Sequence, residues 1–121
     1  MTLLSYLRAD LTPLMKRRDK VALRAVRDAI GAIENAAISY LGAPATAGVP
    51  SEFVAGAVRF GQAERVVRDL DDPAMLAIAR GQVESRLEEA ARLRAAGRVD
   101  QALTLKAEAL ALADRLDAYP G

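Results

Sequence analysis

The chain has 121 residues, of which 52% are hydrophobic and 4% are aromatic, and its formal net charge is +1. It contains no cysteine and no histidine, which excludes disulfides, thiolate nucleophiles and the commonest general base. We expect one domain with an interior of Ala, Leu and Val side chains, and no metal or cofactor.

The N-terminal stretch predicts a helix that begins after Thr2, whose hydroxyl can cap it. Apolar side chains recur at helical spacing and form one face: Leu4, Leu7, Leu11, Leu14 and Met15. Pro13 interrupts this pattern, so either one helix is kinked or stepped there, or Thr12 caps a second, short helix. We prefer the first interpretation.

The next helix is expected to begin after Asp19, which is a good capping residue. Its apolar seam is the longest clean periodicity in the chain: Leu23, Val26, Ile30, Ile33, Ala37 and Leu41. Residues 42–70 are set apart as a loop or insertion. Within it, residues 42–51 read as a loop, residues 51–58 as a short helix, and residues 62–70 as either a helical turn or an extended connector.

The C-terminal stretch, residues 72–119, predicts two helices joined by a tight turn at Ala96-Gly97-Arg98. Asp71 and Asp72 cap the first helix, and Pro73 suits its start. Its expected inward stripe is Leu76, Ala79, Val83, Leu87, Ala90 and Leu93, and that of the second helix is Leu103, Ala107, Leu110, Ala113 and Leu116. Gly97 stops the first helix, and Asp100 or Val99 begins the second. The predicted fold class is therefore all-α: a single bundle of about four helices that ends in an antiparallel helical hairpin.

One charged cluster is a candidate site for phosphate contacts: Lys16, Arg17, Arg18, Lys20, Arg24 and Arg27. Guanidinium and ammonium groups gathered at one helix start can neutralise the charges of an RNA backbone. The alternative is a solvated turn whose cations pair locally with Asp19, Asp28 or Glu34, which is the commoner case for a charge run. No aromatic platform accompanies the cluster, so stacking on single-stranded bases is not expected.

The remaining polar groups predict no catalytic residue. Glu84, Glu88 and Glu89 read as a solvated helix face on which Glu88 and Arg92 can pair. The serines have no histidine partner. No apolar run approaches the roughly 20 residues of a membrane span, and no signal peptide is evident, so we expect a cytoplasmic protein that does not bind membranes.

Two blocks of the sequence resemble the GatB/YqeY family and cover residues 3–41 and 73–120. The first is Leu4-x-x-Leu7-Arg8-x-Asp10-Leu11-Thr12-x-Leu14-Met15-Lys16-x-Arg18-Asp19-Lys20-x-x-Leu23-Arg24-x-Val26-Arg27, followed by Ala32-Ile33-Glu34-Asn35. The second is the Ala96-Gly97-Arg98 turn, the helix with Ala107-Glu108, and the exit at Tyr119-Pro120.

The resemblance implies a helical lobe associated with tRNA, with an aminoacyl-tRNA-handling enzyme, or with the tRNA-dependent amidotransferase, a carbon–nitrogen ligase that uses glutamine as amide donor. Family members continue into a second small domain, and we expect this chain to correspond to the first lobe alone. No intrinsic ligase activity is expected, although the chain could support amidotransfer in trans. The alternative function is a protein-interaction module or a homo-oligomer without RNA binding, formed through spare apolar surface on the Leu23–Leu41 seam or on the hairpin.

Overall fold

A computed structural model describes residues 1–40, 65–67 and 70–121, and it divides the chain into two units. The first unit combines Met1–Ile33 with Asp71–Gly121, and the second is Glu34–Leu70. The expected loop at 42–51 and the expected short helix at 51–58 lie outside the described residues.

Two short helices, α1 (Leu3–Ala9) and α2 (Leu11–Arg17), form the N-terminal stretch. Thr2 caps α1 as expected, because its hydroxyl accepts a hydrogen bond from the Ser5 amide. The step between the helices falls at Asp10, three residues before Pro13. Pro13 thus lies in the first turn of α2, where the missing amide hydrogen has no intrahelical acceptor to lose.

The third helix, α3 (Lys20–Ala37), begins where the sequence predicted, because an Asp19 carboxylate oxygen accepts from the Ala22 amide at 3.1 Å. It ends earlier than predicted. Residues Ile38–Tyr40 form strand β1, which pairs antiparallel with β3 (Arg65–Val67) and joins Ile38 to Val67. The seam therefore stops at Ala37, and Leu41 lies beyond the described residues. Of the two expectations for residues 62–70, the extended one holds at Arg65–Val67.

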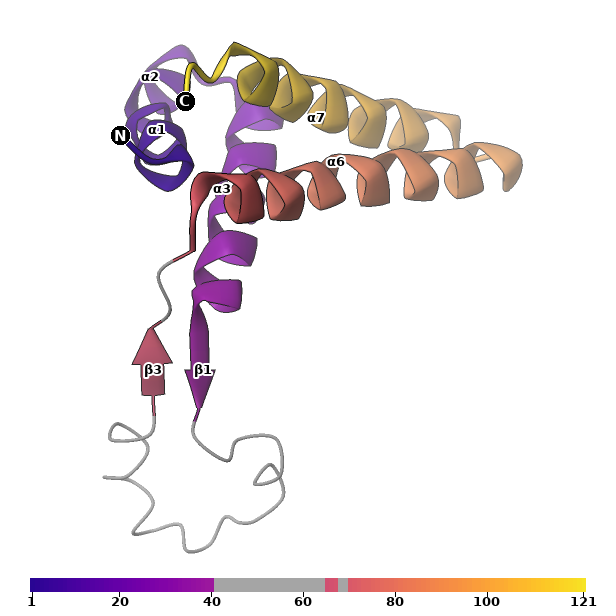
Figure 1. Cartoon of the computed structure of the whole chain (residues 1–121). Coiled ribbons are helices and arrows are strands. Elements are labelled where there is room, and N and C mark those ends of the chain that lie inside the picture. Colours follow the sequence, from indigo (N-terminus) through magenta and orange to yellow (C-terminus); the bar gives the residue numbers. More distant parts are fainter. Residues whose placement is uncertain (41–64, 68–69) are drawn as a thin grey trace, which may run out of the picture. The chain divides into compact units, whose positions relative to one another are not determined.

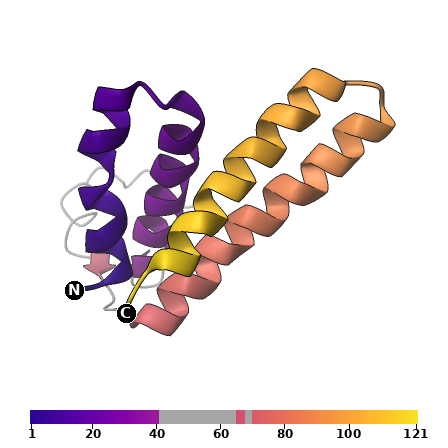
Figure 2. The same cartoon turned by 90° about the horizontal axis from the view of Figure 1, so that it is seen from above.

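The C-terminal hairpin consists of α6 (Asp72–Ala95) and α7 (Val99–Ala118), which run antiparallel side by side (Figures 1 and 2). The Asp71 carboxylate caps α6 by accepting from the Ala74 amide. Gly97 has a φ of +83°, the left-handed conformation that the turn requires and that glycine adopts without steric cost. The second helix begins at Val99, so Asp100 lies in its first turn rather than at its cap.

The core of the first unit uses stripes that differ in part from the predicted ones. In α1 and α2 the buried residues are Leu3, Leu7 and Leu14, while Met15 is exposed. In α6, Met75, Ala79, Val83 and Ala90 are buried, and Leu87 is exposed. In α7 the buried set is Ala102, Glu108, Ala109, Leu112 and Leu116.

The predicted stripe of α7 was therefore wrong except at Leu116. The structure leaves Leu103, Leu110 and Ala107 exposed and Ala113 half-buried. The physical reason is that α7 carries leucines on two neighbouring stripes, and either one fits a period of 3.6 residues. The packed stripe is the one that contains Leu112.

A small hydrogen-bond network joins both ends of the chain to the start of α6. The Tyr119 hydroxyl lies 2.5 Å from the Asp72 carboxylate and 3.2 Å from the Met1 carbonyl oxygen. The other Asp72 oxygen accepts from the Leu3 amide at 2.9 Å. The all-α fold class is confirmed, and none of the described helices is long and apolar enough to cross a membrane.

Candidate nucleic-acid interface

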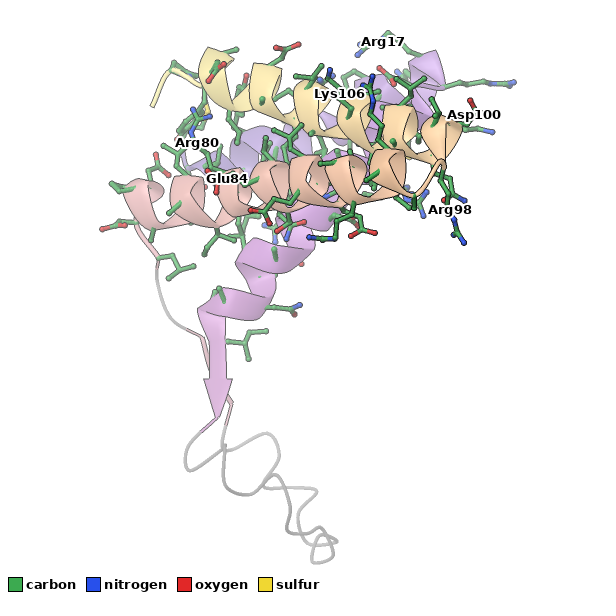
Figure 3. The ribbon with its side chains drawn as sticks, turned by 90° about the vertical axis from the view of Figure 1, so that its right-hand side faces the viewer. Arg17, Arg80, Glu84, Arg98, Asp100 and Lys106 are labelled. Atoms are coloured by element: carbon green, nitrogen blue, oxygen red, sulfur yellow. The ribbon has the colours of Figure 1, made fainter. Side chains whose placement is uncertain are left out.

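The basic cluster occupies the end of α2, the turn that follows, and the first turns of α3. Its six members all have exposed side chains: Lys16, Arg17, Arg18, Lys20, Arg24 and Arg27. Figure 3 shows Arg17 at the upper edge of the view. Six positive charges thus lie within twelve consecutive residues on the surface of the first unit.

The turn that presents these residues is built by the local sequence. Arg18 ends α2 in the left-handed conformation, with a φ of 57°. Its amide donates to the Met15 carbonyl oxygen at 3.1 Å, and the Asp19 amide donates to the Leu14 carbonyl oxygen at 3.0 Å. These bonds close α2, and the Asp19 carboxylate opens α3 directly afterwards.

The acidic residues near the cluster are engaged elsewhere. Asp19 is occupied by the Ala22 amide. Asp28 pairs with Arg86 of α6, and Asp10 pairs with Arg115 of α7 at 2.5 Å. Neither Asp19 nor Asp28 forms an ion pair with a member of the cluster, while all six cationic side chains are exposed, as a solvated turn would leave them.

The six cations consequently form no ion pair with any residue that the structure describes. Lys20, Arg24 and Arg27 border one open depression of about 210 Å³ on α3, which Leu23 and Asp28 also line. An Arg27 guanidinium nitrogen lies 3.7 Å from the Met15 sulfur, so this side chain reaches back to the end of α2. This contact joins one cation of α3 to the residue that precedes Lys16 on α2.

The chemistry of this surface suits phosphates rather than bases. The N-terminus of α3 adds its partial positive charge to that of the side chains. Tyr6 packs its ring against Tyr119, with the ring centroids 5.0 Å apart, and the six members of the cluster are all Lys or Arg. A polyanion can approach the cations without displacing an acidic partner, which lowers the cost of binding.

The other polar groups singled out in the sequence have structural roles. Hydrogen bonding to Tyr119 and to the Leu3 amide lowers the pKa of Asp72, and the same contact raises the pKa of Tyr119 to about 12. Arg92 pairs with Glu89 at 2.6 Å, not with Glu88 as predicted. Among residues 1–40, 65–67 and 70–121, no three acidic side chains gather in a way that could hold a metal ion.

The sequence allowed for spare apolar surface on the hairpin but assigned Leu87, Leu103 and Leu110 to the core, whereas the structure leaves these three side chains exposed. The second apolar stripe on α7 was the feature that could have revealed this exposure. We compared the chain with family models, curated proteins and solved structures, and nothing matches.

Proposed function

We propose that this chain is a non-catalytic helical module that binds tRNA through the six cations of the α2–α3 turn. The observation that carries the proposal is the state of the nearby acids: Asp10, Asp19 and Asp28 are engaged by other partners, which leaves the cations unpaired among the described residues. A turn that existed only for solubility would gain from pairing its charges locally.

The family resemblance supplies the identity of the polyanion. If the chain is related to the GatB/YqeY proteins, its partner is tRNA, or an enzyme that handles aminoacyl-tRNA such as the amidotransferase. The proposal assigns no bond-making step to this chain. Its role is to hold the RNA, or to position it for a separate enzyme.

The number of cations fixes the expected salt dependence. Each phosphate that a cation neutralises releases about 0.7 to 0.9 counterions, depending on whether the RNA is single- or double-stranded. Contacts by all six side chains therefore predict a slope of roughly −4 to −5 in a plot of log K against log salt concentration.

The test is the affinity of fluorescently labelled tRNA for the full chain, measured by anisotropy. The variant carries Arg17→Glu and Arg24→Glu, which are exposed and unpaired within the described residues. We expect its affinity to fall by about tenfold or more at low salt, with a shallower salt slope, because two attractive contacts become repulsive.

The matched control carries Arg80→Glu and Arg92→Glu, which change the net charge by the same amount. Both control arginines are exposed, and each already pairs with an acidic side chain: Arg80 with Asp117 at 3.0 Å, and Arg92 with Glu89. The control should bind tRNA nearly as well as the unaltered chain. Equal losses in both variants would show that net charge, not the α2–α3 cluster, sets the affinity.

A further inference from the structure

One acidic residue lies among the cations of the α2–α3 turn. Asp28 lines the open depression on α3 together with three members of the cluster: Lys20, Arg24 and Arg27. Arg24 comes four residues before Asp28, and side chains at that spacing are neighbours on a helix surface. On α3 alone, Arg24 is therefore the expected partner of Asp28, and such a pair would take one cation away from an incoming phosphate.

The structure gives Asp28 a different partner. Arg86 reaches it from α6, 58 residues away in the sequence, and a guanidinium nitrogen pairs with the carboxylate. Two further contacts fix this guanidinium, which donates to a Glu108 carboxylate oxygen at 3.1 Å and to the Gln82 amide oxygen at 3.1 Å. Only 11% of the Arg86 side chain is accessible to solvent. The hairpin thus holds the guanidinium in place.

The two candidate partners of Asp28 differ in the side-chain freedom that pairing removes. Arg86 is already fixed by its contacts within the hairpin, so its pair with Asp28 orders only one further side chain. Arg24 is exposed, and a pair with it would order two mobile side chains in a high dielectric for little gain. Arg86 therefore outcompetes Arg24 for the carboxylate.

We propose that Arg86 is a positioning residue for phosphate binding, because it holds the Asp28 carboxylate toward the hairpin and keeps it from pairing with Arg24. This role rests on the proposed function, since it concerns the same six cations. The basic cluster then depends on a residue of another helix. Loss of the hairpin contact should weaken binding although every member of the cluster is intact.

The test compares the unaltered full chain with Arg86→Met/Glu108→Leu in tRNA anisotropy titrations at several salt concentrations. This double variant removes both members of the buried pair and leaves the net charge unchanged, and it frees Asp28 to pair with Arg24. We expect the affinity at low salt to fall about two- to fivefold, the strength of an exposed ion pair that the phosphate must now displace. The salt slope should become less steep by about 0.7 to 0.9, the contribution of one phosphate contact.

The substitution Asp28→Asn supplies the rescue. Added to Arg86→Met/Glu108→Leu, it should restore the affinity and the slope, because no carboxylate at position 28 then competes for Arg24. In the unaltered chain it should raise the affinity by a smaller factor, since Arg86 already holds the carboxylate. Both backgrounds gain the same charge from this substitution, so the difference between its two effects isolates the contact between Arg86 and Asp28.

Circular dichroism checks that each variant is folded. If Arg86→Met/Glu108→Leu unfolds, Arg86→Gln/Glu108→Gln takes its place, because it keeps a hydrogen-bonding side chain at both positions and also leaves the net charge unchanged. A loss of affinity that Asp28→Asn restores supports the proposal.

Three results overturn the role of Arg86 while tRNA binding by the unaltered chain stands. They are an unchanged affinity in the double variant, a loss that Asp28→Asn does not restore, and an equal gain from Asp28→Asn in both backgrounds. If the unaltered chain does not bind tRNA, the proposed function fails, and the role of Arg86 fails with it.

Discussion

The hairpin and α3 meet at a buried charge, which makes a sharp test of how the first unit holds together. Glu108 is 3% exposed, and one of its oxygens accepts from the Arg86 guanidinium at 3.1 Å. The same guanidinium donates to the Gln82 amide oxygen at 3.1 Å and pairs with Asp28. No buried side-chain nitrogen or oxygen in the described part of the chain lacks a partner.

The perturbation is Arg86→Met, which keeps the unbranched apolar stem of the side chain and removes the charged guanidinium. Glu108 would then be a buried carboxylate without a counter-ion, and breaking a buried pair in this way costs about 3–5 kcal/mol. That cost is a large part of the roughly 5–15 kcal/mol by which domains are stable. The double variant Arg86→Met/Glu108→Leu removes both charges and is expected to recover most of the loss.

The assay is urea unfolding followed by circular dichroism, with Asp28→Asn as the control. Asp28 is half-exposed, with 52% of its side chain accessible, so its pair with Arg86 contributes at most about 1 kcal/mol. The reasoning is refuted if Arg86→Met costs no more than Asp28→Asn, or if the double variant is as unstable as the single one.

Further predictions concern the core, the backbone and pH. Leu112→Ala should lower the free energy of unfolding by about 2–5 kcal/mol in urea melts, because Leu112 is fully buried, whereas Leu103→Ala should change it by less than about 0.5 kcal/mol. Gly97→Ala should cost about 1–2 kcal/mol, because its φ of +83° strains any side chain although open space surrounds the position. Gly31→Ala should stabilise α3 by about 0.5–1 kcal/mol in thermal melts, since the added methyl meets nothing within 4 Å. The hydrogen bond from Tyr119 to Asp72 should make stability pH-dependent, because it raises the pKa of the Tyr119 hydroxyl to about 12. Its contribution to stability is complete below about pH 10 and is lost as pH rises through about 12. Tyr119→Phe should therefore flatten the alkaline limb of a stability–pH curve.

The pH dependence that comes from Asp72, the carboxylate that Tyr119 contacts, has the opposite sign. The pKa of Asp72 is lowered by the Tyr119 hydroxyl and by the Leu3 amide, so its contribution is present above the ordinary carboxyl pKa and is lost as pH falls through the lowered value. Asp72→Asn should therefore remove part of the acid-induced loss of stability.

The helix ends were predictable because they depend on short-range chemistry. Thr2, Asp19 and Asp71 each accept a hydrogen bond from the amide three residues ahead, and Gly97 supplies the left-handed turn. The C-terminal end of α3 and the strands were not predictable in this way. Strand β1 requires a partner at Arg65–Val67, and no local periodicity reports such pairing.

The packing register of α7 was also beyond reach of the sequence, since its two leucine stripes are equally periodic. The sequence identified the six cations of the candidate interface, but it could not show whether nearby carboxylates pair with them. That pairing depends on Arg86 and Arg115, which lie 58 and 105 residues from the carboxylates that they bind. Contacts at that separation are set by the fold, so only the structure shows that the cluster keeps its charge.

The most direct test of the central claim is the salt dependence of tRNA binding by the unaltered chain, compared with Arg17→Gln/Arg24→Gln. The account predicts a slope of log K against log salt of roughly −4 to −5 for the unaltered chain, and a slope about 1.4 to 1.8 less steep for the variant. A slope near zero, or an identical slope in both proteins, would contradict phosphate binding by the α2–α3 turn.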